Sequence, residues 1–106
     1  MTVLPALVAQ LVYVCDAWII GSAAAPDADL AQVRDFDVLV PFANWPQAAA
    51  LIPSTAEPNT FGGWKCQSFG REVDVWPDSL DRILVRVLNS HIWHPNSGVR
   101  WQKVST

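Results

Sequence analysis

The hydrophobic positions near the N-terminus recur at the three- and four-residue spacing of an amphipathic helix. They are Leu4, Val8, Leu11 and Cys15. Thr2 is a candidate cap for this helix, and Pro5 falls in its first turn, where the missing N–H of proline is tolerated. The pattern predicts a first helix that buries one face.

Shorter apolar runs further along the chain predict strands. Residues 18–20 and 35–41 are two such runs. Residues 64–68 and 71–76 are two more, and the short separation at Phe69-Gly70 predicts that they pair as a hairpin.

Two further helices follow from the same rules. Asn44 is a candidate N-cap of a helix through Ile52, with Pro46 in its first turn and Pro53 after its end. Asp78 is a candidate cap of a final helix with an apolar stripe. The stripe consists of Leu80, Ile83, Leu84, Val87 and Leu88.

The remaining segments connect these elements. Residues 23–34 predict a short helix or a loop, because Pro26 interrupts them, and residues 53–63 predict a polar loop. Residues 101–104 predict a last edge strand or a frayed end. Helices and strands therefore alternate, which is typical of an α/β or α+β fold. A length of 106 residues indicates one domain over 1–106.

Composition and charge narrow the class of protein. Hydrophobic residues make up 51% and charged residues 16% of the chain, so we expect a globular and not a disordered protein. The net charge of −3 gives no overall basic field, so a polyanion would be held by a metal or a local patch. Cys15 and Cys66 lie in apolar stretches, where two buried free thiols are favoured over a disulfide.

The N-terminal segment contains an apolar run that ends in Gly-Ser-Ala-Ala-Ala, like the cleavage site of a secretory signal. A signal begins with basic residues, but the first Lys or Arg of this chain is Arg34. Pro5, Gln10 and Asp16 interrupt the run, which is too short and polar to span a membrane. We therefore expect a cytoplasmic protein that does not enter a membrane.

Three aspartates lie within apolar strand-like runs, where an uncompensated charge is costly. Asp35 and Asp37 would stand side by side, because side chains at i and i+2 of a strand share a face. Asp74 lies between two valines in the later run 71–76. Mg²⁺ takes oxygen ligands, and two such ions can clamp the attacking and leaving oxygens of a displacement. Three carboxylates on neighbouring strands therefore predict a divalent-metal site.

Gly21 and Ser22 follow the first strand-like run and are candidates for holding a phosphate. Gly21 lets the backbone approach a phosphate closely. Ser22 adds a hydroxyl and an amide N–H, and a short helix starting at Ala23 would aim further N–H groups at the anion.

The chain resembles the polymerase-beta-like nucleotidyltransferase superfamily in the conjunction of these motifs. They are a hydrophobic residue with Gly-Ser, a spacer of 12 residues, Asp-hydrophobic-Asp-hydrophobic, and a later hydrophobic-Asp-hydrophobic strand. The resemblance covers residues 18–88. It implies a minimal, stand-alone core, in which a small mixed β-sheet has helices packed on one side.

The resemblance also implies an activity. A nucleoside monophosphate would move from an NTP such as ATP to a hydroxyl on a protein, an RNA or a small molecule. Asp35, Asp37 and Asp74 would be the catalytic residues and the ligands of Mg²⁺ or Mn²⁺. Gly21 and Ser22 would bind the nucleotide phosphates. The short chain would work with a separate protein partner or as a homo-oligomer.

Tryptophans and one further carboxylate have two interpretations each. Trp64, Trp76 or Trp93 could stack on a nucleobase, although core filling is favoured for any one of them. Glu72 shares a face with Asp74, where it is an accessory ligand or a solvated strand residue.

Histidines and arginines also have two interpretations. His91 and His94 could be metal ligands or acid–base groups, but a surface or capping role is favoured because no carboxylate motif adjoins them. Arg71, Arg82 and Arg86 could neutralise a triphosphate, whereas Arg82 and Arg86 are more simply the solvated face of a helix.

A second class of function stays open at this point. The same fold can serve as a non-catalytic binding or regulatory subunit, similar to an antitoxin. The three aspartates favour the enzyme, whereas the short chain, with no domain for an acceptor, favours the subunit.

Overall fold

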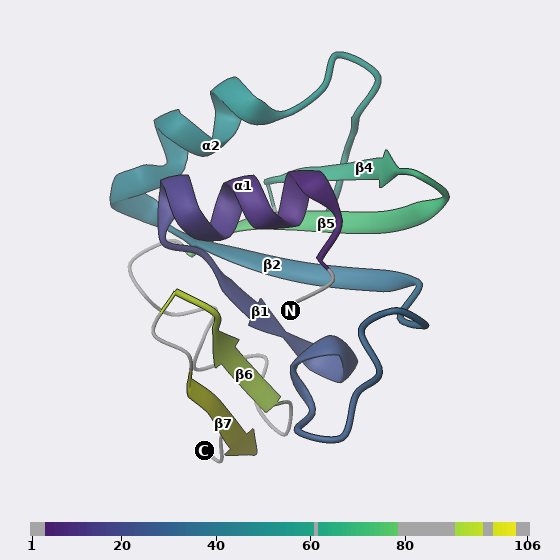
Figure 1. Ribbon diagram of the computed structural model, residues 1–106. Helices are drawn as coiled ribbons and strands as arrows, with labels where there is room; N and C mark the ends of the chain where they lie inside the picture. The colour runs from purple at the N-terminus through teal and green to yellow at the C-terminus, as the bar shows by residue number, and fades with distance from the viewer. Residues whose placement is uncertain (1–3, 61, 79–90, 97–98, 104–106) are drawn as a thin grey trace.

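Two helices pack on one side of a mixed sheet in the computed structural model, which describes residues 4–60, 62–78, 91–96 and 99–103 (Figure 1). The fold is α+β, as predicted. The helices are α1 (Ala6–Cys15) and α2 (Trp45–Leu51), and η1 (Gly21–Ala24) and η2 (Phe42–Asn44) are short 3-10 helices. The strands are β1 (Trp18–Ile20), β2 (Asp35–Pro41), β3 (Glu57–Pro58), β4 (Trp64–Ser68), β5 (Arg71–Asp78), β6 (His91–His94) and β7 (Val99–Lys103).

The described strands form a seven-stranded sheet in the order β3-β4-β5-β2-β1-β6-β7. The central pair, β2 and β5, is parallel, and the other pairs are antiparallel. The connection from β2 to β5 runs through α2, β3 and β4, which gives the chain the length that a parallel crossover needs. The predicted hairpin is confirmed: β4 and β5 pair around Phe69 and Gly70, whose φ angles are 50° and 81°.

α1 buries Leu7, Val8, Leu11, Val12 and Cys15 against the sheet and α2. The predicted helix is therefore present, and its buried face is wider than the spacing alone suggested. It begins three residues later than a helix capped by Thr2 would, because Pro5 is its N-cap residue instead of lying in its first turn, and Thr2 itself lies outside the described residues.

α2 begins directly after Asn44, as predicted, but Asn44 does not cap it through its side chain. Its amide Nδ2 instead donates a hydrogen bond of 3.0 Å to the carbonyl oxygen of Cys15. The capping prediction was wrong because the end of α1 lies close enough to take this donor. Asn44 thereby ties the end of α1 to the start of α2.

Other sequence predictions differ from the structure or lie beyond the part it describes. The helix expected at Ala23 is the one-turn 3-10 helix η1, and turns follow it to residue 34. Asp78 ends β5 and is buried, and the helix predicted over 80–88, which Asp78 was expected to cap, lies outside the described residues. β3 and β6 were not predicted, whereas β7 lies where an edge strand was one of two expectations.

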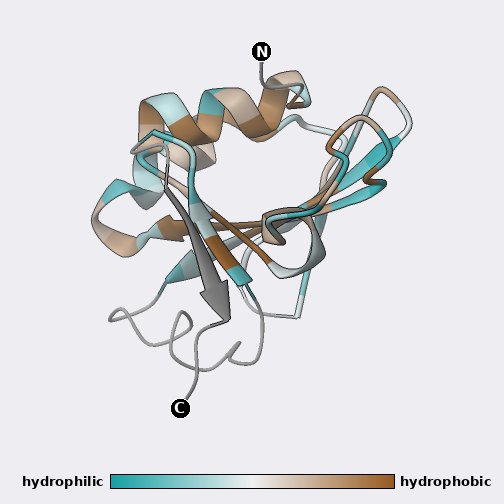
Figure 2. Cartoon of the chain, turned by 60° about the horizontal axis from the view of Figure 1, so that its bottom comes forward, coloured by the Kyte–Doolittle hydropathy of each residue, from teal (hydrophilic) through white to brown (hydrophobic). Residues whose placement is uncertain are grey.

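The main core lies between the sheet and the helices. Figure 2 shows hydrophobic segments along α1 and the central strands. Phe36, Val73 and Val75 are fully buried there, together with the free thiols of Cys15 and Cys66, as the sequence predicted. Burial, and for Cys66 the nearby Asp74 as well, raises the pKa of these thiols, which keeps them in the neutral form.

A smaller apolar cluster lies on the opposite face of the sheet. It consists of Ile20, Leu39 and Ile92, with Trp18 and Trp76 packed against it. Neither helix in the described part of the chain is long and apolar enough to cross a membrane.

Candidate functional site

Four carboxylates lie on the sheet face that points away from the helices. β2 and β5 pair with Asp37 opposite Asp74 and with Asp35 opposite Glu72. Phe36, between the two aspartates of β2, is fully buried on the helical side. Because side chains alternate along a strand, all four carboxylates are on the other face. We call Asp35, Asp37, Glu72 and Asp74 the carboxylate cluster.

Asp37 is the member of this cluster whose carboxyl pKa is strongly shifted. It is half-buried, and burial, followed by the charges of Asp74, Asp35 and Glu72, raises its pKa from 3.8 to about 6. Among the residues that the structure describes, no Lys or Arg forms an ion pair with Asp37, and Lys65 Nζ lies 4.0 Å from Glu72 Oε1 instead. Within the described part of the chain, no basic side chain therefore balances the charge of the ionised Asp37 carboxylate.

Gly21 closes one side of the cluster. β1 pairs with β2 so that Ile20 is opposite Asp37, and Gly21 follows with a φ angle of +77°. A Cβ atom on Gly21 would lie 3.2 Å from Asp37 Oδ2. Glycine at this position therefore supplies both the left-handed backbone and the space beside the carboxylate.

Ser22 lies in the same turn, with an exposed side chain. The 3-10 helix η1 is only four residues long. The longer row of N–H groups predicted after Ala23 is therefore not formed. A phosphate near this turn would rely on the Ser22 hydroxyl and on local backbone N–H groups.

The chemistry of the cluster suits a hard divalent cation. Mg²⁺ commonly binds through one or two carboxylates together with phosphate oxygens, and Asp37 and Asp74 are such a pair on adjacent strands. Within the described ranges, no three His, Cys, Asp or Glu side chains are gathered closely enough to hold a metal ion together. A cation at this face would therefore depend on substrate oxygens, and the joint role of Asp35, Asp37 and Asp74 as ligands stays a prediction.

A pocket of about 350 Å³ adjoins Asp74 on the side away from Gly21. Its walls are formed by Glu57, Pro58, Asn59, Thr60, Lys65, Asp74 and Trp76. Asn59 shapes the loop beside it: Nδ2 donates to the carbonyl oxygen of Val75 at 3.2 Å, and Oδ1 accepts from the N–H of Gly63 at 2.9 Å. The lining combines polar side chains with the aromatic ring of Trp76.

Sequence reasoning missed Lys65 and Asn59 as candidate residues. The hairpin register provided a signal for Lys65, because counting outward from the predicted turn at Phe69-Gly70 places Lys65 opposite Asp74. No local motif distinguished Asn59, which lies in a segment predicted only as a polar loop.

The three tryptophans considered near the site have different surroundings. Trp76 lines the pocket beside Asp74. Trp64 packs against the main core, and Trp93 is buried in it. Of these three, only Trp76 lies where it could stack on a ligand at the carboxylate face.

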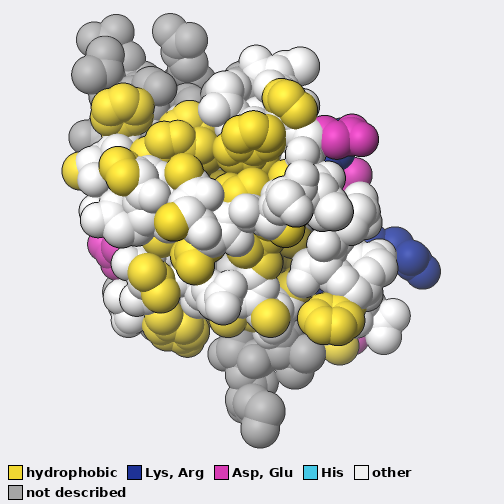
Figure 3. All heavy atoms as spheres, turned by 90° about the horizontal axis from the view of Figure 1, so that it is seen from above, with side chains coloured by type: hydrophobic (Ala, Val, Ile, Leu, Met, Phe, Trp, Pro, Cys, Tyr) yellow, Lys and Arg dark blue, Asp and Glu magenta, His cyan; other side chains and the backbone are white. Residues whose placement is uncertain are grey.

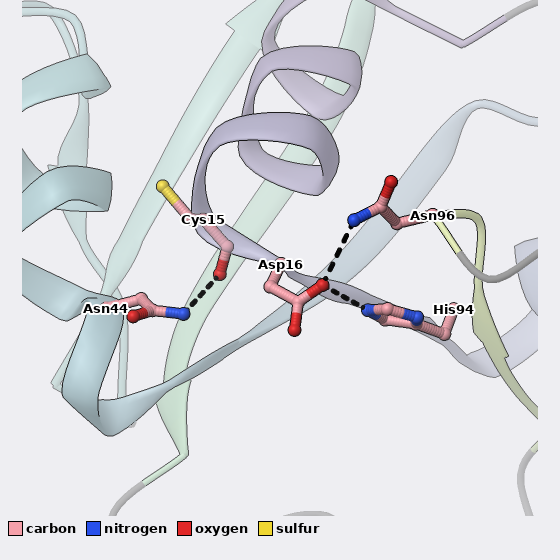
Figure 4. A network of polar contacts seen from close by, with 5 residues as sticks. All are labelled: Cys15, Asp16, Asn44, His94 and Asn96. Carbon is pink, nitrogen blue, oxygen red and sulfur yellow. Dashed lines mark hydrogen bonds and ion pairs between the residues drawn. The ribbon is translucent and has the colours of Figure 1, made fainter.

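The histidines lie at a different corner of the sheet. His94 Nε2 is 2.7 Å from Asp16 Oδ1, and Asn96 Nδ2 donates to the same oxygen at 3.3 Å (Figure 4). The ring of His94 also lies 4.7 Å from that of Trp18, centroid to centroid. These contacts join the end of α1 to β6, so His94 has a structural role, and His91 begins β6.

Comparisons with protein-family models, with curated proteins and with solved structures gave no match to this chain.

Proposed function

We propose that the protein is a metal-dependent nucleotidyltransferase, which transfers a nucleoside monophosphate from an NTP to a hydroxyl group. The observation that carries this proposal is the register of β2 and β5, which sets Asp37 opposite Asp74 beside the Gly21 turn. Like charges on adjacent strands repel each other. A divalent cation bound between the carboxylates would offset this repulsion, which explains their arrangement better than solvation alone.

Each residue of the proposed site has a distinct task. Asp37 and Asp74, together with Asp35, would hold Mg²⁺ or Mn²⁺, which when bound would neutralise phosphate charge and polarise the reacting oxygens. Gly21 leaves room beside Asp37, and Ser22 supplies a hydroxyl to a phosphate. Positioning and charge stabilisation provide most of the catalysis in this class of reaction, so few residues are needed.

The pocket beside Asp74 would hold part of the substrate or the acceptor. Trp76 offers an aromatic surface, and Asn59, Thr60 and Lys65 offer polar groups. The acceptor can be a protein, an RNA or a small molecule, and each has a hydroxyl group.

The direct test is incubation with labelled NTPs, Mg²⁺ or Mn²⁺, and a cell extract. We expect a labelled acceptor, and we expect Asp37→Asn to lower the labelling roughly 100-fold or more, as loss of a charge-stabilising group does in other enzymes. Asp35→Asn and Asp74→Asn should behave alike. Asp27→Asn is the matched control, because Asp27 is exposed in the loop before β2.

The alternative is a non-catalytic subunit of nucleotidyltransferase-like fold that binds a partner, similar to an antitoxin. The observation that favours it is that no group of three metal-binding side chains forms within the described segments. If the three Asp→Asn variants fold and keep full biological effect, the binding subunit is correct and the enzyme is not.

A further inference from the structure

Two arginines lie side by side where the parallel strands β2 and β5 begin. The register pairs Asp35 with Glu72, and Arg34 and Arg71 each come one residue earlier. The N–H of Glu72 donates a hydrogen bond of 2.8 Å to the carbonyl oxygen of Arg34, so the pairing extends to this position. The start of β2 and the turn between β4 and β5 lie on the same side of the molecule (Figure 1). Two cationic side chains next to each other on adjacent strands repel each other.

No carboxylate in the described part of the chain forms an ion pair with either arginine. The Arg71 guanidinium lies over the ring of Phe36, 6.0 Å from its centroid, on the helical side of the sheet. Arg71 therefore points away from the carboxylate cluster and is not placed to neutralise a triphosphate there. In the view of Figure 3 the visible Lys and Arg side chains lie only along one edge of the molecule. Positive charge on the helical side is thus local and unbalanced.

Both arginines line one pocket of about 330 Å³. The other described residues that line it are 31–33, Phe69 and Gly70, and none of them is acidic. A Cβ atom on Gly70 would meet nothing within 4 Å, so the backbone of this turn is open to a ligand. Within the described part of the chain, the pocket therefore has two positive charges and no negative one, although the net charge of the protein is −3.

The Arg71 guanidinium is held in place before any ligand binds. One of its terminal nitrogens donates to the carbonyl oxygen of Leu30 at 3.1 Å, and the other donates to that of Ala31 at 2.9 Å. A guanidinium has five N–H groups, so the others remain for a ligand. Arg34 is exposed and can turn toward the same ligand. A donor group that is already ordered lowers the entropic cost of binding.

Charge and size indicate the class of ligand. A phosphate monoester has a charge of about −2 near pH 7 and three acceptor oxygens, and this charge balances two guanidinium groups, which bind phosphate through paired N–H groups. The pocket has roughly ten times the ~30 Å³ that one water molecule occupies in the liquid. An organic group attached to the phosphate therefore fits beside the ring of Phe69.

We propose that Arg34 and Arg71 form a binding site for the phosphate group of a phosphate monoester, on the sheet face opposite the carboxylate cluster. The site goes beyond the proposed transferase activity, because it uses neither a residue nor a metal ion of that activity. A free small molecule and the 5′-end of an RNA can carry the same group, and the experiment distinguishes these two sources.

NMR titration of the isotope-labelled full chain with phenyl phosphate, at about pH 7.5 and without divalent metal, tests the proposal. We expect the backbone amide shifts of residues 31–34 and 69–71 to change, with a dissociation constant below roughly 1 mM. Arg34→Gln should raise this constant roughly tenfold, because it removes one charged hydrogen-bonding group. Lys65→Gln is the matched control and should leave the constant unchanged, since Lys65 is exposed opposite Asp74 on the carboxylate face.

Several results would overturn the proposal. They are no binding of phenyl phosphate, binding no tighter than that of the singly charged phenyl sulfate, and shift changes centred on Asp74 and Trp76 instead. Binding of inorganic phosphate without binding of phenyl phosphate would also overturn it, as would weaker binding in Lys65→Gln but not in Arg34→Gln.

A short RNA with and without a 5′-phosphate identifies the source of the group. If the phosphorylated RNA binds roughly tenfold more tightly than phenyl phosphate, the site takes an RNA end, and if it binds equally or less tightly, the site takes a small molecule. Either result supports the phosphate site. An RNA with a 5′-hydroxyl group that binds as tightly as the phosphorylated one would overturn it.

Discussion

Phe36 and Asp37 are neighbours in β2, yet they lie in opposite environments. Phe36 points toward the helices and is fully buried, whereas Asp37 is half-buried among other carboxylates. Burying one large apolar side chain stabilises a fold by roughly 1.5–3 kcal/mol. Several such residues on the helical side outweigh the repulsion on the other side. Burial of the apolar side chains on one face of β2 and β5 thus stabilises the sheet that carries the carboxylates on its other face.

The free energy of unfolding should be more sensitive to substitutions on the core side of β2 than to substitutions on its carboxylate side. Phe36→Ala is expected to lower the free energy of unfolding by about 3–5 kcal/mol, because it removes a buried ring and leaves a cavity. Urea denaturation measures this loss. Phe69→Ala is the matched control, since its ring is 95% accessible, and a similar loss in both variants would show that the core has been misplaced.

Gly21 lies beside Asp37, and its replacement should have the next largest effect on stability. Gly21→Ala forces a side chain into the left-handed region at roughly 1–2 kcal/mol and also crowds Asp37 Oδ2 at 3.2 Å. Gly70→Ala has a similar φ angle of +81° with nothing within 4 Å of the added Cβ. We expect a lower Tm for Gly21→Ala than for Gly70→Ala. Equal values would mean that Asp37 moves aside freely.

Divalent metal should stabilise the carboxylate face without touching the core. At ten times the dissociation constant, a ligand of the folded state adds about 1.4 kcal/mol, which raises the Tm of a domain of this size by several degrees. Mn²⁺ or Mg²⁺ at millimolar concentration should give this shift with the wild-type chain and with Asp27→Asn, but not with Asp37→Asn. A Tm that ignores the metal would contradict the proposed site.

The smallest expected effect is the pH dependence of folding stability that Asp37 causes. The folded-state pKa of Asp37 is raised from 3.8 to about 6, so the folded chain holds this proton more tightly than the unfolded chain. The resulting contribution to stability is present below about pH 4 and is lost as the pH rises through 6. One pKa unit corresponds to about 1.4 kcal/mol, and solvent screening of a half-buried group leaves about 1 kcal/mol.

Asp37→Asn should remove this pH dependence. The stability of the variant relative to the wild type should therefore increase between pH 4 and 7, as measured by urea denaturation without metal. Asp27→Asn should keep the wild-type dependence. A constant difference between Asp37→Asn and the wild type across this range would show that neither burial nor the other carboxylates raise the Asp37 pKa.

Local rules predicted α1, α2 and the β4–β5 hairpin, because each depends on residues close in sequence. The common face of Asp35 and Asp37 also follows from strand alternation alone. The register that places Asp37 opposite Asp74 could not be derived in this way, because it is set by the packing of β2 and β5 across the core. The pocket beside Asp74 was not predicted either, because no local motif distinguishes Asn59, although the hairpin register alone places Lys65 opposite Asp74.

Errors arose where a distant partner competed with a local one. Asn44 has the residue type and position of a helix cap, but its amide binds the Cys15 carbonyl from another element. The pairing of His94 with Asp16 was not predicted, because the two residues are distant in sequence and spacing could not find the contact.

The parallel pairing of β2 and β5 also determines when the carboxylates meet during synthesis. Asp37 leaves the ribosome well before Asp74 and Glu72, and α2, β3 and β4 are made in between. Until β5 emerges, Asp37 is free of two of the charges that raise its pKa. The repulsion therefore begins only when Val73 and Val75 arrive with β5 to close the core. A nascent chain that stops before β5 would have neither the carboxylate cluster nor the packing that holds it.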